Sequence, residues 1–364
     1  MSLSAYIHIP FCKKKCSYCA FYSASASAQT IEEYVKALEN QIRHSDNKGC
    51  KLASVFLGGG TPSILLPQQY TRILNAIDTV FDISSSEITT EINPDSVSNL
   101  LDIGLADRFT RFSMGVQSFD DEELSLLGRV HTSSQAVDAF KSLRNAGADN
   151  INIDLMLALP SRDHLNKLKS TLEKAISLSP EHISAYILTP EEGTPFFDNF
   201  APVSDELSDD AYLLTCEFLE KAGYEHYEIS NFAKKGFRCR HNMSYWTQEK
   251  YLAFGPSSCG FDGKNRYRIN CSVNEYIKNN GIVPPIIEET LTDEDLRSEK
   301  IMLALRLSDG IDRKILDEIC KNDEKKRFVD YLLDSFLAVK NESGGISLTD
   351  RGFLLSNRII SELM

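Results

Sequence analysis

The stretch IHIPFCKKKCSYCAFYS, from Ile7 to Ser23, joins an apolar segment to three closely spaced cysteines. Ala5–Ile9 is short, apolar and partly alternating, which predicts a strand. Cys12, Cys16 and Cys19 follow at once with the spacing C-x₃-C-x₂-C. Thiolates bind soft metals. The sequence therefore predicts a metal site in the loop where the first strand ends.

The first two-thirds of the chain alternates strand-like and helix-like segments. The predicted strands are Ala5–Ile9, Ser54–Leu57, Glu87–Ile92, Phe112–Val116, Asn150–Leu157, His182–Leu188 and a short one at Glu225–Ile229. The predicted helices are Thr30–Ile42, Pro67–Phe81, Ser96–Leu105, Asp120–Leu127, Ser134–Ala146, Leu165–Leu178 and Asp209–Ala222. Such repetition builds a parallel sheet, and the count falls short of the eight units of a closed barrel. We predict an α/β fold with an open, partial (β/α)₆ barrel of TIM type.

The chain is predicted to have three regions. Residues 1–235 form the partial barrel, residues 236–288 an irregular connecting segment with many Gly, Asn and Tyr, and residues 289–364 a small C-terminal module. Helical patterns in the module precede a hairpin with a turn at Gly344-Gly345, an order typical of a winged-helix-like α+β domain. Its acidic residues argue against DNA binding, so we expect a cap or a partner surface.

Charge and hydropathy narrow the class of partner. The chain has 364 residues and a formal net charge of −13. It has no basic block of five or more residues, and nucleic-acid binding depends on a positive surface. No apolar run approaches the roughly 18 residues of a membrane span, and a signal-peptide layout is absent. We therefore expect a cytoplasmic protein without a nucleic-acid partner or membrane insertion.

The cysteine triplet favours an iron–sulfur cluster over zinc. In a reducing compartment, clustered cysteines indicate metal or redox ligands rather than disulfides. A structural zinc site usually has four ligands, often as two C-x₂-C pairs, whereas the other six of the nine cysteines are scattered. A [4Fe–4S] cluster on three cysteines leaves one iron with an open position, which distinguishes catalytic from structural metals. A chance triplet of buried cysteines is the alternative.

C-x₃-C-x₂-C after an N-terminal strand resembles the radical S-adenosylmethionine superfamily. YIHIPFC resembles its branch containing oxygen-independent coproporphyrinogen III oxidase and a related haem chaperone, and the resemblance covers nearly the whole chain. It implies that Cys12, Cys16 and Cys19 hold a [4Fe–4S] cluster whose fourth iron is chelated by S-adenosylmethionine. It also implies that one electron cleaves the sulfonium to a 5′-deoxyadenosyl radical, and hence a small-protein electron donor.

The loops after the later strands fit the same resemblance. Gly58-Gly59-Gly60-Thr61-Pro62 closes the second strand; glycines let a backbone approach a ligand closely, although a tight turn is the alternative. A Glu or an Asp within an apolar strand is costly without a partner. The resemblance implies cofactor contacts from Tyr6, Tyr18, Gly59, Gly60, Thr61, Glu91, Gln117, Arg129 and Asp154. The glutamate corresponds to a ribose contact, and the last three to contacts of a second S-adenosylmethionine in the oxidase.

Two features distinguish the oxidase from the chaperone. The oxidase pattern has a fourth cysteine two residues after the third, and here that position is Phe21, where the chaperone typically has an aromatic residue. The HN-x₂-YW run resembles a chaperone feature implicated in haem handling, and imidazole is a standard haem ligand. Haem contacts are therefore expected from His241, Tyr245 and Trp246. A structural turn is the alternative for this run.

The sequence thus predicts a haem chaperone that binds a [4Fe–4S] cluster, S-adenosylmethionine and haem, and delivers haem to an acceptor protein. The alternative is the oxidase reaction, in which two propionates of coproporphyrinogen III become vinyls. A third possibility keeps radical chemistry with another substrate. Two residues depart from the chaperone pattern: Ala20 replaces an Asp, and Cys259 stands where a His is common, which leaves a second haem ligand open.

Overall fold

The computed structural model describes residues 3–101 and 105–364. Its strands are β1 (Leu3–Ile9), β2 (Ser54–Gly59), β3 (Glu87–Ile92), β4 (Arg111–Gln117), β5 (Ile151–Leu157), β6 (His182–Ile187), β7 (Glu225–Glu228), β8 (Asn231–Ala233), β9 (Lys250–Phe254), β10 (Cys259–Phe261), β11 (Asn265–Arg268), β12 (Ile286–Thr290), β13 (Ala338–Lys340) and β14 (Ile346–Leu348). Its α-helices are α1 (Ala28–Arg43), α2 (Pro67–Val80), α3 (Ser98–Leu101), α4 (Asp121–Leu126), α5 (Ser133–Asn145), α6 (His164–Leu178), α7 (Pro195–Asn199), α8 (Asp205–Lys221), α9 (Arg240–Trp246), α10 (Val273–Lys278), α11 (Asp293–Ala304), α12 (Arg313–Ile319), α13 (Asp323–Asp334), α14 (Asp350–Leu354) and α15 (Ser356–Leu363).

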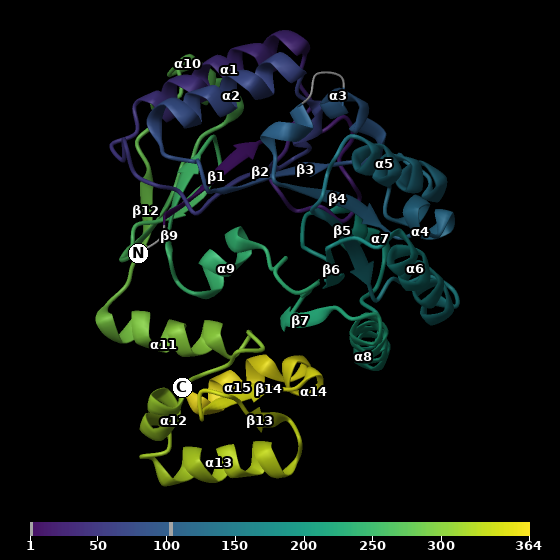
Figure 1. The fold of residues 1–364 in the computed structure, drawn as a ribbon, viewed down its shortest axis with the longest axis vertical. Helices are drawn as coiled ribbons and strands as arrows, with labels where there is room; N and C mark the ends of the chain where they lie inside the picture. The colour runs from purple at the N-terminus through teal and green to yellow at the C-terminus, as the bar shows by residue number, and fades with distance from the viewer. Residues whose placement is uncertain (1–2, 102–104) are drawn as a thin grey trace.

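One large sheet organises the molecule, with the strand order β12-β11-β10-β9-β1-β2-β3-β4-β5-β6-β8-β7. Strands β1 to β6 lie side by side in chain order, and each neighbouring pair among them is parallel. Helices cover the outer side of this curved sheet, as Figure 1 shows. The predicted α/β fold with a mostly parallel, open barrel is therefore confirmed. The short seventh strand, β7, instead forms an antiparallel pair with β8 at the sheet edge.

The helices pack on the sheet through the apolar faces that their periodicity predicts. In α1 the buried face includes Ile31, Val35 and Leu38, spaced three to four residues apart. The sequence pattern predicts that this helix starts at Thr30, but it starts about one turn earlier, at Ala28. Ser27 is the N-cap residue, and its side chain accepts the Thr30 N–H at 3.1 Å. The helix predicted over Ser96–Leu105 appears as the short α3, and part of that range lies outside the described residues.

The segment 236–288 was expected to be irregular, and this expectation is wrong. It contains α9, α10, three strands and the start of β12, and it extends the sheet beyond β1. Strand β9 runs parallel to β1, and β10, β11 and β12 add antiparallel strands. Strands of three to five residues are too short for alternation to show in the sequence. The boundaries of the three regions remain a prediction.

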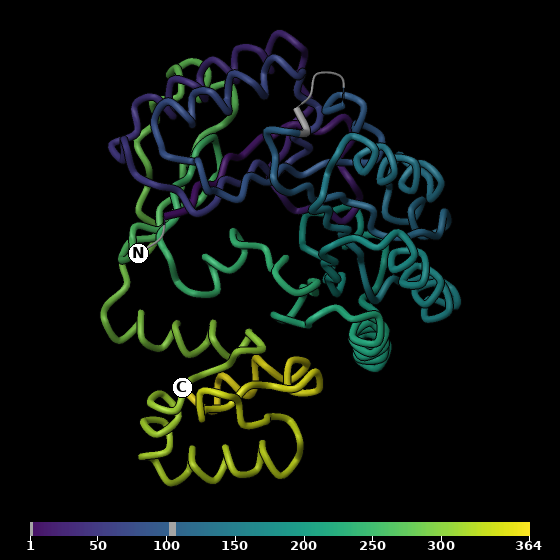
Figure 2. The backbone as a smooth tube through the Cα atoms, viewed as in Figure 1, coloured from purple at the N-terminus to yellow at the C-terminus, as the bar shows by residue number. Residues whose placement is uncertain are grey.

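The C-terminal module consists of α11 to α15 and the two-stranded hairpin β13–β14. Figure 2 shows this part of the chain gathered on the side of the molecule where α9 lies, away from the outer helices α1 and α2. The module joins the barrel through β7, because Ser308 N–H donates to the Tyr227 carbonyl oxygen at 3.0 Å. Within the described residues, no helix has the length and apolar character needed to cross a membrane.

Candidate functional site

The cysteine loop follows β1 and is fixed at two points. Cys12 N–H donates to the Ala24 carbonyl oxygen at 3.3 Å, which closes the base of the loop. Ser17 N–H donates to the Leu127 carbonyl oxygen at 3.1 Å, which holds its tip against the end of α4. Cys12, Cys16 and Cys19 are all free and partly exposed. The strand therefore presents three thiols on one anchored loop, as the sequence predicts.

The glycine loop after β2 packs directly against the cysteine loop. Thr61 N–H donates to the Phe11 carbonyl oxygen at 2.7 Å. A Cβ at Gly60 would lie 2.6 Å from that same oxygen. Gly59 has φ of +107°, and a Cβ there would lie 2.2 Å from the His8 ring. Contact between the two loops therefore requires these glycines, in addition to any approach of a ligand.

A chain of hydrogen bonds joins two of the cysteines to the loops of later strands. Thr61 Oγ1 donates to Cys12 Sγ at 3.5 Å and accepts from Asn93 Nδ2 at 3.1 Å. Arg129 donates to Cys16 Sγ at 3.2 Å and to Asn93 Oδ1 at 2.7 Å. These hydrogen bonds fix the positions of the two sulfur atoms relative to the loops after β2, β3 and β4. The sequence reasoning missed Asn93, although the Asn-Pro stop after β3 marks its loop.

Two acidic side chains inside the barrel, Glu91 and Asp154, have raised pKa values because they are buried. Glu91 accepts the Gly59 N–H at 3.0 Å, and Asp154 accepts from Asn152 Nδ2 at 2.7 Å. Burial, and next the charge of Asp154, raise the pKa of Glu91 to about 7. Burial also raises the pKa of Asp154. Both carboxyl groups therefore lie in a low-dielectric site where a hydrogen-bonding ligand would stabilise them.

Three buried polar atoms of this region have no hydrogen-bond partner among the described residues. They are Gln117 Oε1, Arg129 Nε and Arg111 Nε. Gln117 also has φ of 73°, in the left-handed region that non-glycine residues rarely adopt. Buried polar groups are nearly always paired, and backbone strain clusters at ligand sites. These atoms therefore indicate a polar ligand.

One cavity of about 610 Å³ unites these residues. Its volume lies within the roughly 300–1,000 Å³ of small-molecule sites. The wall contains eleven of the twelve residues predicted for the cluster and the cofactor: Cys12, Cys16, Tyr18, Cys19, Gly59, Gly60, Thr61, Glu91, Gln117, Arg129 and Asp154. It also contains Phe21, Arg111 and Asn242, so the cavity extends from the cysteine loop to α9. The sequence reasoning missed Arg111, whose only signal was a charge at the start of an apolar strand.

Tyr6 is the predicted cofactor residue that the described cavity wall does not include. Its hydroxyl hydrogen-bonds to His8 Nδ1 at 3.0 Å, and its ring lies 6.2 Å from the Phe56 ring. Its side chain is partly exposed and packs on the inner side of β1 rather than in the main core. Burial, followed by nearby ionisable groups that include Cys259, raises the pKa of Tyr6. Cys259 is the first residue of β10, which pairs with β9, the neighbour of β1.

The HN-x₂-YW run forms α9, and its histidine is enclosed. His241 is 1% exposed. Its Nδ1 lies 2.9 Å from Ser54 Oγ, its Nε2 lies 2.8 Å from the Tyr245 hydroxyl, and its ring stacks on Phe56 at 4.9 Å. Burial lowers the pKa of His241 to about 3, so the imidazole is neutral at pH 7. Tyr245 and Trp246 follow on α9 and are partly buried.

The start of α9 is bound to the amino end of β3. Glu87 accepts the N–H groups of Arg240 and His241 at 3.2 and 3.3 Å, and the Cys239 thiol donates to it at 3.5 Å. A carboxylate at a helix N-terminus is stabilising. This geometry supports a structural role for the HN-x₂-YW run. The run is a helix rather than a turn, and His241 is held by the side chains of Ser54 and Tyr245. Haem ligation by His241 stays a prediction, and it requires the enclosed imidazole to give up the hydrogen bond at whichever ring nitrogen would bind the iron.

Comparison with known proteins places these features in a family. The chain matches the Radical SAM superfamily over residues 6–187. It is 33% identical to "Heme chaperone HemW" of Lactococcus lactis subsp. lactis (strain IL1403), over 99% of this chain and 97% of that protein. It is also 33% identical to "Heme chaperone HemW" of Bacillus subtilis (strain 168), over 99% of each.

A solved structure agrees with the fold. Coproporphyrinogen III oxidase (HemN) from Escherichia coli superposes with a TM-score of 0.82, covering 100% of this chain and 90% of that chain. At 22% identity this likeness shows the fold alone. The superfamily match, the anchored cysteine loop and the full-length relatives agree with one another. The chain therefore belongs to the radical SAM superfamily and, within it, to the family of the heme chaperone HemW.

Proposed function

We propose that this protein is a haem chaperone, which carries a [4Fe–4S] cluster and S-adenosylmethionine and delivers haem to an acceptor protein. Membership of the superfamily implies the cluster and S-adenosylmethionine. The full-length relatives named as heme chaperones support haem delivery. The structural observation that carries the proposal is Phe21, a 69% exposed aromatic residue on the cavity wall where the oxidase pattern has its fourth cysteine.

The residues present fit the implied cofactors. Cys12, Cys16 and Cys19 offer three free thiols on one loop, which suits a cluster with one open iron. The unpaired Gln117 Oε1 and Arg129 Nε offer an acceptor and a donor to S-adenosylmethionine. When bound, the cluster supplies one electron to the sulfonium. Thr61 and Arg129 hold the Cys12 and Cys16 sulfurs by hydrogen bonds, and the cavity walls would shield a bound cofactor from water.

The cavity mouth fits the first contact with haem better than α9 does. Phe21, Tyr186 and Ile187 line the cavity and are 69%, 36% and 37% exposed. Exposed large apolar side chains that gather at one cavity mark a binding surface, and aromatic rings suit the face of a porphyrin. Lys14 and Lys15 line the same cavity and can pair with propionates. His241, by contrast, is enclosed.

Oxidation of coproporphyrinogen III is the second candidate function. It is supported by the resemblance of YIHIPFC to the branch that contains the oxidase, whereas the fold match, with a TM-score of 0.82, is compatible with both functions. Both functions use the same cavity, the same cysteine loop and a tetrapyrrole ligand. They differ at Phe21, because the oxidase pattern has a cysteine at this position.

One pair of measurements separates the two functions. Anaerobically reconstituted protein is incubated with coproporphyrinogen III, S-adenosylmethionine and a reductant, with the E. coli oxidase as the positive control. We expect no protoporphyrinogen IX from this protein. We expect haem to bind with a shifted Soret band and to pass to an apo haem protein added later. Formation of protoporphyrinogen IX, or haem that is bound but never released, overturns the proposal.

A further inference from the structure

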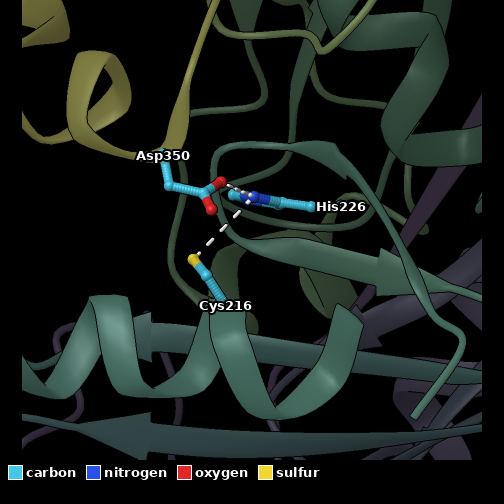
Figure 3. Close-up of side chains that lie close together, drawn as sticks. All are labelled: Cys216, His226 and Asp350. Carbon is cyan, nitrogen blue, oxygen red and sulfur yellow. Dashed lines mark hydrogen bonds and ion pairs between the residues drawn. The ribbon is translucent and has the colours of Figure 1, made fainter. Parts of the chain in front are cut away.

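Three metal-binding side chains meet where the barrel contacts the C-terminal module, outside the cavity described above. Cys216 lies on α8, His226 on β7, and Asp350 is the first residue of α14. Their ligand atoms all lie within 4.8 Å of one another. Figure 3 shows the three side chains pointing toward one another from separate elements. No role in haem or cofactor binding accounts for this group.

The Asp350 carboxylate and the Cys216 thiol both lie close to one nitrogen of the His226 ring. His226 Nδ1 lies 2.8 Å from Asp350 Oδ1 and 3.9 Å from Cys216 Sγ. In a tetrahedral zinc site with bonds of about 2.0–2.3 Å, neighbouring ligand atoms are about 3.3–3.5 Å apart. One observed distance is shorter than this and the other is longer. For these two pairs, an ion needs shifts of about half an ångström. The third pair, Cys216 Sγ and the Asp350 carboxylate, lies within 4.8 Å and would close around the ion.

The histidine is held in a suitable orientation for coordination through Nδ1. Its ring stacks on Phe232 at 4.2 Å with an interplanar angle of 15°. Its other nitrogen, Nε2, lies 3.4 Å from the Tyr212 hydroxyl, and this hydroxyl donates to the Ile229 carbonyl oxygen at 2.8 Å. A metal-bound imidazole usually has its second nitrogen hydrogen-bonded in this way. Both Cys216 and His226 are buried, which excludes bulk water from the donors.

A second carboxylate, that of Glu220, lies near the group without being one of its three donors. Glu220 follows Cys216 by four residues on α8, so the two share one helix face. Glu220 interacts electrostatically with Asp350 and with His226. The carboxylates of Asp350 and Glu220 place negative charge near the thiol and the imidazole, and this charge attracts a cation. Sulfur and imidazole donors select zinc rather than magnesium or calcium, with water as the fourth ligand.

We propose that Cys216, His226 and Asp350 bind a zinc ion that fastens the C-terminal module to the barrel. The ion would join residues 124 positions apart in the chain, His226 and Asp350. Binding to the folded arrangement alone stabilises it by mass action. The proposal does not depend on the haem function, because none of the three residues lines the cofactor cavity.

Metal content tests the site directly. The holoprotein, with its cluster loaded so that iron occupies the loop cysteines, is incubated with zinc, dialysed against a weak chelator and analysed for zinc and iron. We expect about one zinc per chain in the wild type and less than about one tenth of that in Cys216→Ser and in Asp350→Asn, with iron unchanged. Cys50→Ser, which removes an exposed thiol elsewhere, is the matched control and keeps its zinc.

A stability measurement keeps the test decisive if Cys216→Ser folds poorly. Asp350→Asn preserves side-chain shape and can still hydrogen-bond to His226. Zinc should raise the melting temperature of the wild type by several degrees and leave that of Asp350→Asn unchanged. The proposal is overturned if the wild-type holoprotein retains no zinc. It is also overturned if either variant retains as much zinc as the wild type, or if the retained metal is iron.

Discussion

The two ends of the barrel carry similar kinds of side chain in opposite states. At the carboxyl ends of the strands, Cys12, Cys16 and Cys19 are free, and Gln117 Oε1 has no partner among the described residues. At the amino ends, His241 is bonded through both ring nitrogens. An unpaired buried polar group costs free energy unless a ligand satisfies it. The carboxyl end is therefore suited to a ligand, and the amino end holds α9 in place.

Residue type alone therefore does not identify a ligand site. Cysteine and histidine occur at both ends, and both runs resemble functional motifs. The loop thiols are partly exposed at a cavity, whereas Cys239 and His241 are buried and hydrogen-bonded to their neighbours. The carboxyl ends of parallel strands are also where loops of this fold class carry chemistry. Substitutions at the two ends of the barrel should therefore have different effects on ligand binding and on stability.

Removal of the loop thiols should have the largest effect. The triple variant Cys12→Ala, Cys16→Ala, Cys19→Ala should bind essentially no iron after anaerobic reconstitution, whereas the wild type binds about four irons per chain. Cys239→Ala removes a buried thiol at the amino end and should keep its iron, because that thiol donates to Glu87. Iron analysis and visible absorbance give the answer. Equal reconstitution of the triple variant would remove the cluster assignment.

His241→Ala should destabilise the protein by about 4 kcal/mol at pH 7, because it removes a stacked, hydrogen-bonded core side chain. Its folded pKa of about 3 is depressed from 6.5. The stabilisation is therefore complete above pH 6.5 and is lost as the pH falls toward 3. The difference from the wild type should shrink to about 2 kcal/mol at pH 5. Urea unfolding at both pH values measures it.

A different outcome at His241 would change the comparison of the two ends. If His241→Ala leaves stability unchanged and abolishes the haem Soret shift, the imidazole is available to haem and the amino end also binds a ligand. His241→Asn, which keeps one hydrogen-bonding group, serves as the milder variant in both measurements.

Glu91→Gln should make the cofactor-free protein more stable at high pH. The folded pKa of Glu91, about 7, is raised from 4.5. Its favourable contribution is thus present below pH 4.5 and is lost as the pH rises through 7. Glutamine removes this loss and still accepts the Gly59 N–H, so we expect a gain of about 2–3 kcal/mol at pH 8 and almost none at pH 4.5. Weaker binding of S-adenosylmethionine should accompany the gain. If Glu91→Gln and the wild type have the same unfolding free energy at both pH 8 and pH 4.5, the prediction is contradicted.

Phe21→Ala should have the smallest effect on the fold. The side chain is 69% exposed, so the unfolding free energy should change by less than about 0.5 kcal/mol. Haem affinity should fall about fivefold, the equivalent of about 1 kcal/mol. Phe197→Ala is the control, since Phe197 is 47% exposed and is not among the residues that line the cavity. Equal haem affinity in both variants would exclude the cavity mouth as the haem contact.

The repeated strand and helix pattern of the barrel and the position of the cysteine loop can be predicted from the amino-acid sequence alone. Both depend on local information. Apolar periodicity sets the buried face of α1, and C-x₃-C-x₂-C places three thiols on one loop regardless of what surrounds it. Glu91, near the carboxyl end of β3, follows from the rule that parallel strands end at one edge. Asp154 lies in the middle of β5 and was expected only from the family resemblance.

Which side chains are hydrogen-bonded within the protein could not be predicted from the sequence, because these bonds join residues far apart in the chain. His241 meets Ser54, which is 187 residues away, and Arg129 meets Cys16, which is 113 residues away. The strands of 236–288 became visible only through pairing with β1. Cys216, His226 and Asp350 likewise show no motif in the sequence. Long-range pairing depends on how the elements pack, which short-range periodicity does not encode.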